Sequence, residues 1–356
     1  MSHTKLYVKH TCMATPTGLC SASTYAAFKA GVDNKREIPF LDNAGDELTG
    51  SFLDLGAMKT RSFRIMIYLR TLFDELVAKT SAEELVCTPI ILLLPEDFPL
   101  TAVDVSTALA SDPDNNSVPE ESSGYLSPSV TIHPEFIHRV HGHATDGFTA
   151  LQLAKSVLDK GSYDTVFLCA ADSLINAVSL QSLDSHHRLL TNRNSDGMIP
   201  GEAAAGVMLT SASKGAMCYV NGVGYGSESS TLYNDIPLRA EGICQATRQA
   251  LDHASLQMHD IDTRISDAAG ESFHFKEQAL MVNRLLRQNK EHFDLILPAR
   301  TLGHTGCCTS LCALALTAMK LNNPDNLDTH ALLCSGDDDG HRAVVVSSKM
   351  PGVMST

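Results

Sequence analysis

The chain has 356 residues, of which 44% are hydrophobic and 19% are charged, so it is long enough for one large domain or two fused halves with a sizeable core. Its formal net charge of −14 argues against nucleic-acid binding, because phosphate recognition needs a basic surface. Its apolar runs are far shorter than the roughly 20 residues of a membrane-spanning helix, and its first ten residues hold no apolar signal segment.

The first half of the chain predicts strands alternating with helices. The residues of 59–80 show apolar side chains at three- and four-residue spacing, which is typical of an amphipathic helix. The predicted elements are a strand at 5–10, a turn and helix within 14–31, the helix at 59–80, a strand at 88–95, a helix, a polar surface loop at 111–124, a further helix, and strands at 164–173 and 203–212.

The second half repeats this alternation. Its predicted elements are a strand at 218–229, a helix at 240–255, a strand at 262–271, a helix at 274–288, a strand at 293–299, a helix, and closing strands at 329–340 and 342–350. Regular alternation of this kind predicts parallel sheets covered by helices on both faces.

The chain also resembles itself. "GHATDGFTALQLAKSVLDKG" at 142–161 matches "GHTGCCTSLCALALTAMKLN" at 303–322, since in both a Gly-His-small turn leads into an apolar helix and then into two strands. We interpret this as a duplicated α/β unit, with an N-terminal half at 1–212 and a C-terminal half at 213–356. Chance similarity between Ala- and Leu-rich helices is the alternative.

Three segments resemble motifs of the β-ketoacyl-(acyl carrier protein) synthases, which belong to the thiolase-like superfamily. They are "TPTGLCSASTYAAFKAGVDN" at 15–34, the stretch 170–211 with its most specific part at Gly197–Leu209, and "LGHTGCCTSLCALAL" at 302–316. The resemblance implies an α/β thiolase-like fold, with two βαβαβαββ halves in five α/β/α/β/α layers.

The family's nucleophilic cysteine has no counterpart in this alignment. When the family's nucleophile turn and helix are laid on this chain without gaps, Gly147 meets the motif glycine and Gly161 ends the helix. The cysteine position then falls on Ala144. A thiolate at a helix N-terminus would carry the acyl group during condensation, so the resemblance implies a member that has lost this step or is impaired in it.

The family's two catalytic histidines are only partly retained. His304 matches the second histidine, whereas the first falls on Ala269, with His274 nearby as a weak substitute. In the C-terminal loop "SGDDDGHR", Gly336 and Gly340 match family glycines, but the aromatic gate is missing. Three aspartates of this loop, Asp337 to Asp339, would place negative charge where an oxyanion should bind.

Several further residues have alternative interpretations. His143 and His141 flank the former nucleophile turn, but no third ligand has motif spacing, so we expect pocket residues and no metal. Cys308 and its neighbour Cys307 begin the second apolar helix; packing is expected, with a substitute nucleophile as the alternative. Gly303 and Gly306 serve the turn around His304, and with Gly336 and Gly340 they are candidate substrate-binding residues.

Basic residues at 59–70 (Lys59, Arg61, Arg64 and Arg70) have two interpretations as well. They could dock an acidic carrier protein, or they could form the solvated face of a helix. The ten cysteines are scattered and form no C-x-x-C pair, which favours reduced thiols and a cytoplasmic location.

The resemblance implies a ketosynthase-like protein of fatty-acid or polyketide-type acyl metabolism, with no cofactor. Its expected partners are an acyl carrier protein or acyl-CoA, and a second subunit, either in a homodimer or with an active synthase as a chain-length-factor-like subunit. Two alternatives remain: a cysteine-independent acyltransferase or malonyl decarboxylase using His304, and a non-catalytic scaffold.

Overall fold

The computed structural model describes residues 5–56, 58–81, 84–85, 88–99, 101, 105–106 and 136–352, except for the side chain of residue 141. The loop predicted at 111–124 lies outside the described residues, as does most of the helix predicted before it. None of the helices in the described ranges is both long enough and apolar enough to cross a bilayer.

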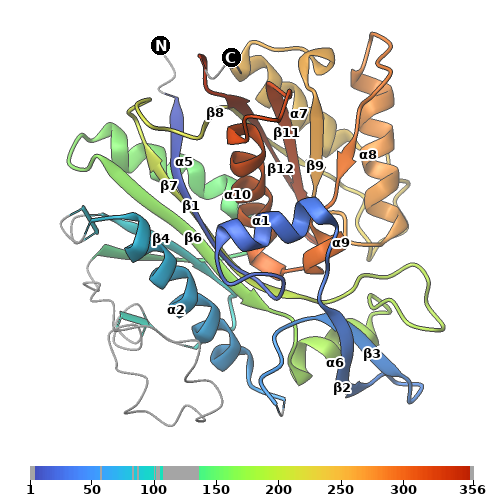
Figure 1. The fold of residues 1–356 in the computed structure, drawn as a ribbon. Helices are drawn as coiled ribbons and strands as arrows, with labels where there is room; N and C mark the ends of the chain where they lie inside the picture. Colours follow the sequence, from blue (N-terminus) through green and yellow to red (C-terminus); the bar gives the residue numbers. More distant parts are fainter. Residues whose placement is uncertain are drawn as a thin grey trace.

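A ten-stranded mixed sheet runs through the molecule in the order β10-β9-β11-β12-β8-β1-β7-β6-β4-β5 (Figure 1). Its strands are β1 (Leu6–Ala14), β4 (Ile90–Leu94), β5 (Ile137–His141), β6 (Thr165–Ser173), β7 (Glu202–Thr210), β8 (Cys218–Ser227), β9 (Thr263–Ser266), β10 (Leu295–Ile296), β11 (His330–Gly336) and β12 (His341–Lys349).

The sheet is parallel only toward its two ends. β4 pairs in parallel with β5 and β6, and β9 with β10 and β11, while the remaining ladders are antiparallel. The prediction of purely parallel sheets is therefore wrong. β11 and β12 are joined by a short turn, which allows only antiparallel pairing. β6 and β7 also pair antiparallel, although the longer connection that contains α6 joins them.

The two halves share one strand order. From the end of the sheet inward, the first half reads β5-β4-β6-β7-β1 and the second reads β10-β9-β11-β12-β8. The halves join where β1 pairs with β8, for example at Tyr7 and Tyr219. The boundary predicted at residue 212 falls between β7 and β8, and the division into two domains there stays a prediction.

Helices form three layers around the two half-sheets, which gives the five layers predicted. α5 (Asp146–Asp159) and α10 (Thr309–Asn322) pack against the inner faces of both half-sheets, through Leu168 and Leu333 among others. α2 (Arg61–Lys79) covers the outer face of the first half-sheet. α7 (Glu241–Ala254) and α8 (Ser272–Leu285) cover that of the second.

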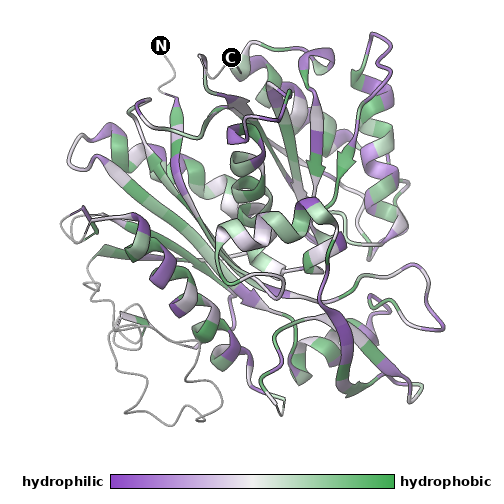
Figure 2. Ribbon diagram, in the orientation of Figure 1, coloured by the Kyte–Doolittle hydropathy of each residue, from purple (hydrophilic) through white to green (hydrophobic). Residues whose placement is uncertain are grey.

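Successive side chains of a strand point to opposite faces, so a strand of consecutive apolar residues is apolar on both. In β6, Leu168 contacts the inner layer and Phe167 the outer one. Figure 2 shows the central strands and α10 mainly in green. α5 packs closely against α10 at Gly147, where a Cβ would lie 2.3 Å from the Ser310 Oγ. The glycine placed there by the motif alignment is thus required by packing.

Three elements escaped the sequence prediction. These are the strands β2 (Lys35–Leu41) and β3 (Glu47–Ser51), which form a hairpin, and the strand β5; α6 (Ala177–Ser185) lies in the stretch 170–211 that resembles the family motif. Gly45 in the hairpin turn has a φ of 86°. A glycine in the short polar segment at 42–46 is the sequence signal from which the hairpin could have been predicted. The other predicted elements that fall within the described residues are confirmed, including α1 (Ser21–Ala30), which ends at Gly31 in a left-handed conformation.

Candidate functional site

A cavity of about 280 Å³ lies where the segments that follow β5, β6, β9 and β11 meet the start of the α10 segment. Open α/β sheets bind ligands at the carboxyl ends of their strands, so the fold itself marks this position. The lining residues are Arg61, Gly142, His143, Ala144, Asp172, Leu174, Leu183, Arg188, Met198, Asp267, His274, His304, Gly306, Cys307, Gly336, Asp337, Asp338 and Asp339.

Six of the predicted site residues line this cavity together: His143, Ala144, His274, His304, Gly306 and Gly336. Four others do not line it. Ala269 lies in the connection from β9 to α8, Gly303 packs against the backbone of 199–201, Gly340 packs against the Glu228 carbonyl, and Cys308 lies in the core. The side chain of His141 lies outside what the structure describes.

Ala144 lies two residues before α5, so it presents a methyl group at the position that the resemblance assigns to the nucleophile. Its carbonyl oxygen accepts a hydrogen bond from the Ser335 hydroxyl at 3.0 Å. At the same helix end, the backbone N–H of His143 donates to the Asp146 carboxylate at 2.7 Å. The turn is therefore ordered by polar contacts but offers no sulfur atom.

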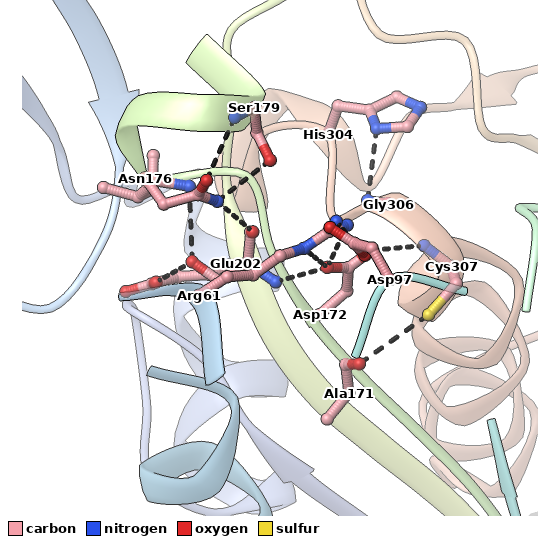
Figure 3. Close-up of polar contacts among 12 residues, drawn as sticks. Arg61, Asp97, Ala171, Asp172, Asn176, Ser179, Glu202, His304, Gly306 and Cys307 are labelled. Carbon is pink, nitrogen blue, oxygen red and sulfur yellow. Dashed lines mark hydrogen bonds and ion pairs between the residues drawn. The ribbon is translucent and has the colours of Figure 1, made fainter. Parts of the chain in front are cut away.

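His304 is held as a neutral hydrogen-bond donor. Its Nδ1 accepts the backbone N–H of Gly306 at 3.2 Å, which leaves the proton of the neutral ring on Nε2, on the side away from Gly306 (Figure 3). Burial lowers the pKa of His304, and the nearby Arg188 charge lowers it further. A neutral imidazole with a free N–H can donate to an oxygen that gains negative charge.

The motif segment around Gly201 holds this histidine in place. The His304 backbone N–H donates to the Ile199 carbonyl at 2.8 Å, and the Gly201 N–H donates to the His304 carbonyl at 2.9 Å. A Cβ on Gly201 would lie 2.1 Å from the Leu302 carbonyl oxygen, so only glycine allows this approach.

His274 belongs to the first turn of α8 and faces Glu271, whose Oε2 lies 3.5 Å from its Nε2. Burial lowers the pKa of His274, but its hydrogen bond to Glu271 and the charges of Asp267 and Glu271 outweigh burial, so the pKa is raised. Burial alone would raise the pKa of Glu271. Its hydrogen bonds with His274 and Arg188 have the larger combined effect and lower the pKa to about 2. The environment of His274 therefore favours the protonated ring, whereas that of His304 favours the neutral ring.

Arg188 links the two halves of the chain at the cavity wall. Its guanidinium forms a buried ion pair with Glu271, donates to the Tyr233 hydroxyl at 2.7 Å, and contacts the Asp338 carboxylate at 2.9 Å. Sequence reasoning missed Arg188 because no motif marks it and its partners lie at least 45 residues away.

The acidic loop lies in the cavity wall, as the alignment predicted. Asp337 is buried and accepts hydrogen bonds from the Thr145 hydroxyl at 3.1 Å and from the His341 backbone N–H at 2.9 Å. Asp339 is exposed, and no Lys or Arg of the described residues pairs with it. Across the cavity, Asp267 accepts from the Ser335 hydroxyl and the Gly336 N–H.

The thiols near the cavity are poor nucleophile candidates. The Cys307 Sγ lies 3.6 Å from the Ala171 carbonyl, on the side away from His304 (Figure 3), and burial followed by the Asp172 charge raises the pKa of this thiol well above its usual value. Cys308 donates to the Ala170 carbonyl at 3.3 Å, and burial likewise raises its pKa. Neither sulfur is poised to become a thiolate.

The basic run at 59–70 is not the single solvated or docking face that we considered. Arg64 is 2% exposed and pairs with Glu202, its Nε lying 2.6 Å from Oε2. Arg61 pairs with Asp172 at 2.8 Å and with Asp97 at 2.6 Å. These guanidiniums neutralise carboxylates of the fold, so they are not free to bind an acidic partner.

No metal site emerges from the residues that the structure describes, since they contain no group of three His, Cys, Asp or Glu side chains suited to an ion. The described cysteines number nine, and all are free thiols.

No family model matches the sequence, and no curated protein matches it. Solved structures do match the fold. A type II polyketide synthase assembly of a ketosynthase with its acyl carrier protein matches with a TM-score of 0.74 and 11% identity, over 97% of this chain and 99% of that one. The ketosynthase ApeO with its chain length factor ApeC from Xenorhabdus doucetiae matches with 0.69 and 12%, over 98% and 100%.

A third match is the oxazolomycin ketosynthase domain OzmH KS7 of Streptomyces albus, with a TM-score of 0.71 and 14% identity over 97% of this chain and 75% of that one. Identities this low establish the shared architecture. The chain therefore shares its fold with these ketosynthases, as the sequence motifs predicted.

Proposed function

We propose that the chain is a ketosynthase-like subunit of acyl metabolism, of the fatty-acid or polyketide type, that binds an acyl thioester without forming an acyl-enzyme. The observation that carries the proposal is Ala144, which offers a methyl group beside the cavity that holds His304. The burial of Cys307 and Cys308 supports it, because their raised pKa values disfavour a substitute thiolate.

Partnership with a second chain is part of this proposal. Two of the similar structures are described as a ketosynthase with a chain length factor, and another as a ketosynthase with an acyl carrier protein. Among the residues that the structure describes, β5 ends the sheet, so one of its edges has no neighbour there and can pair with a strand of another chain. We propose a chain-length-factor-like role beside an active synthase, with a homodimer as the alternative, and a carrier protein or CoA as the source of the acyl group.

Mass spectrometry of the intact protein tests the missing acyl-enzyme. After incubation with an acyl-pantetheine thioester, the natural chain is expected to gain no acyl mass. The Ala144→Cys variant restores a thiol at the N-terminal end of α5, close to His304, and is expected to become acylated. An adduct on the natural chain that disappears in Cys307→Ser or Cys308→Ser would refute the proposal.

Light scattering tests the partnership. A particle of twice the chain mass supports self-pairing, whereas a particle of the chain mass supports the need for a different partner chain. In either case His138→Asp, which adds charge at an exposed position of β5, is expected to weaken pairing.

A further inference from the structure

The cavity wall has more acidic than basic side chains. Five aspartates line it, against two arginines, which is a formal excess of three negative charges at neutral pH. Glu271 is not counted here, although it lies directly behind the wall and pairs with Arg188. Any positive charge on His274 is already matched by Glu271 at 3.5 Å.

Both guanidiniums are already paired with carboxylates of the fold, so neither is available to bind a ligand carboxylate. Both oxygens of Asp172 are occupied, one by the Arg61 Nε and Nη2 at 3.1 and 2.8 Å, and the other by the Cys307 N–H at 2.9 Å. The remaining Arg61 nitrogen contacts Asp97 at 2.6 Å. Arg188 is shared among Glu271, Asp338 and the Tyr233 hydroxyl.

Three carboxylates, by contrast, have no Lys or Arg partner among the described residues. Asp267 accepts hydrogen bonds from neutral donors, the Ser335 and Ser266 hydroxyls and the Gly336 N–H. Asp337 contacts the His341 Nδ1 at 3.0 Å, and Asp339 is exposed. A ligand carboxylate would therefore meet uncompensated like charge in a partly dehydrated cavity, where charge repulsion is stronger than in water. An uncharged acyl group would meet the Nε2–H of His304 without that repulsion.

We infer that the cavity accepts uncharged acyl thioesters and rejects those that carry a carboxylate, such as a malonyl group, and that Asp338 and Asp339 determine this specificity. The inference rests on the proposed acyl-binding function and specifies its substrate class. It also disfavours malonyl decarboxylation by His304, because that reaction requires a carboxylate in the cavity.

A matched pair of ligands tests the inference. The pantetheine thioester of malonic acid and that of its monoamide have the same number of non-hydrogen atoms and differ by one charge. Titrated into the full chain at physiological ionic strength, the amide is expected to bind at least about tenfold more tightly, equivalent to about 1.4 kcal/mol. Higher ionic strength is expected to reduce the difference.

Two variants test the assignment to the loop. Asp339→Asn removes an exposed charge with no ion-pair partner, so it preserves the fold and is expected to lower the discrimination. Asp338→Asn is expected to lower it further, because it removes a negative charge from Arg188, whose Nη1 then keeps only the Tyr233 hydroxyl as a hydrogen-bond partner among the described residues. The matched control is Asp325→Asn, which makes the same change in net charge beyond the C-terminal end of α10 and should leave discrimination unchanged.

The control is distant enough, because the 14 residues of α10 span about 21 Å, more than two screening lengths at physiological ionic strength. Equal binding of both thioesters to the natural chain would overturn charge selection while leaving acyl binding intact. Binding of neither would overturn the acyl-binding function together with the inference. Discrimination that survives in both loop variants would overturn the role of Asp338 and Asp339.

Discussion

The ion pair between Arg64 and Glu202 is the sharpest test of how the motif segment stabilises the fold. Their side chains are 3% and 0% exposed, and the carboxylate also accepts from the Tyr68 hydroxyl at 2.8 Å, the Ser173 hydroxyl at 2.7 Å and the Leu53 N–H at 3.0 Å. Glu202→Gln keeps the shape but leaves the buried guanidinium without its counter-charge. Breaking one side of a buried pair costs about 3–5 kcal/mol.

That cost corresponds to a measurable fall in melting temperature. With an unfolding entropy of about 2.1 cal/mol/K per residue, a 356-residue chain loses about 1.3 °C per kcal/mol, or about 4–7 °C here. Urea unfolding measures the free energy, and its slope should stay unchanged. Glu37→Gln, at an exposed position of β2, is the matched control and should change stability by less than about 0.5 kcal/mol.

A loss below about 1 kcal/mol for Glu202→Gln would refute this reasoning, because it would mean that Arg64 finds water or another partner without cost. The double variant Arg64→Met with Glu202→Gln separates the two terms. We expect it to be more stable than Glu202→Gln alone, since no unpaired buried charge remains.

Three further predictions concern the site. Because the pKa of Glu271 falls to about 2 from 4.5, its contribution of up to about 3 kcal/mol is present above pH 4.5 and is lost as the pH falls toward 2; urea unfolding should show a weaker acid dependence for Glu271→Gln than for the natural chain. The lowered pKa of His304 predicts a titration midpoint below 6.5 for its imidazole resonances, and a midpoint above 6.5 by NMR would contradict this. Gly147→Ala should cost about 1–3 kcal/mol, since its methyl would overlap Ser310; an unchanged unfolding midpoint would show that α5 and α10 separate freely.

Charge on the cavity wall is where this chain departs most from what a condensing site requires. Under the proposed alignment, the negative loop at Asp337–Asp339 and the methyl group of Ala144 would act in the same direction: one would disfavour a developing oxyanion, and the other would leave no atom to carry the acyl group. Both features nevertheless leave an ordered cavity with a neutral histidine donor, which is why we propose that the cavity binds an acyl thioester.

Much of the architecture could be predicted from the sequence alone. Apolar periodicity predicted α2, the alternation of strands and helices predicted α7 and α8, and the apolar runs predicted β4 and β6. The repeat at 142–161 and 303–322 predicted a duplicated α/β unit, and the sheet shows the same strand order in both halves. These features are local or repeated, and local spacing is enough to specify which face of a helix or strand is apolar.

The tertiary structure alone decided which charged side chains are neutralised by ion pairs inside the fold and which face the cavity. Arg64 looked like a surface residue because its partner Glu202 is 138 residues away, and Arg188 meets Glu271 across 83 residues and Asp338 across 150. Strand β5 was hidden in the same way, because its five residues become a strand only through pairing with β4. Burial and pairing depend on distant residues, so side-chain spacing along the chain carries no direct record of them.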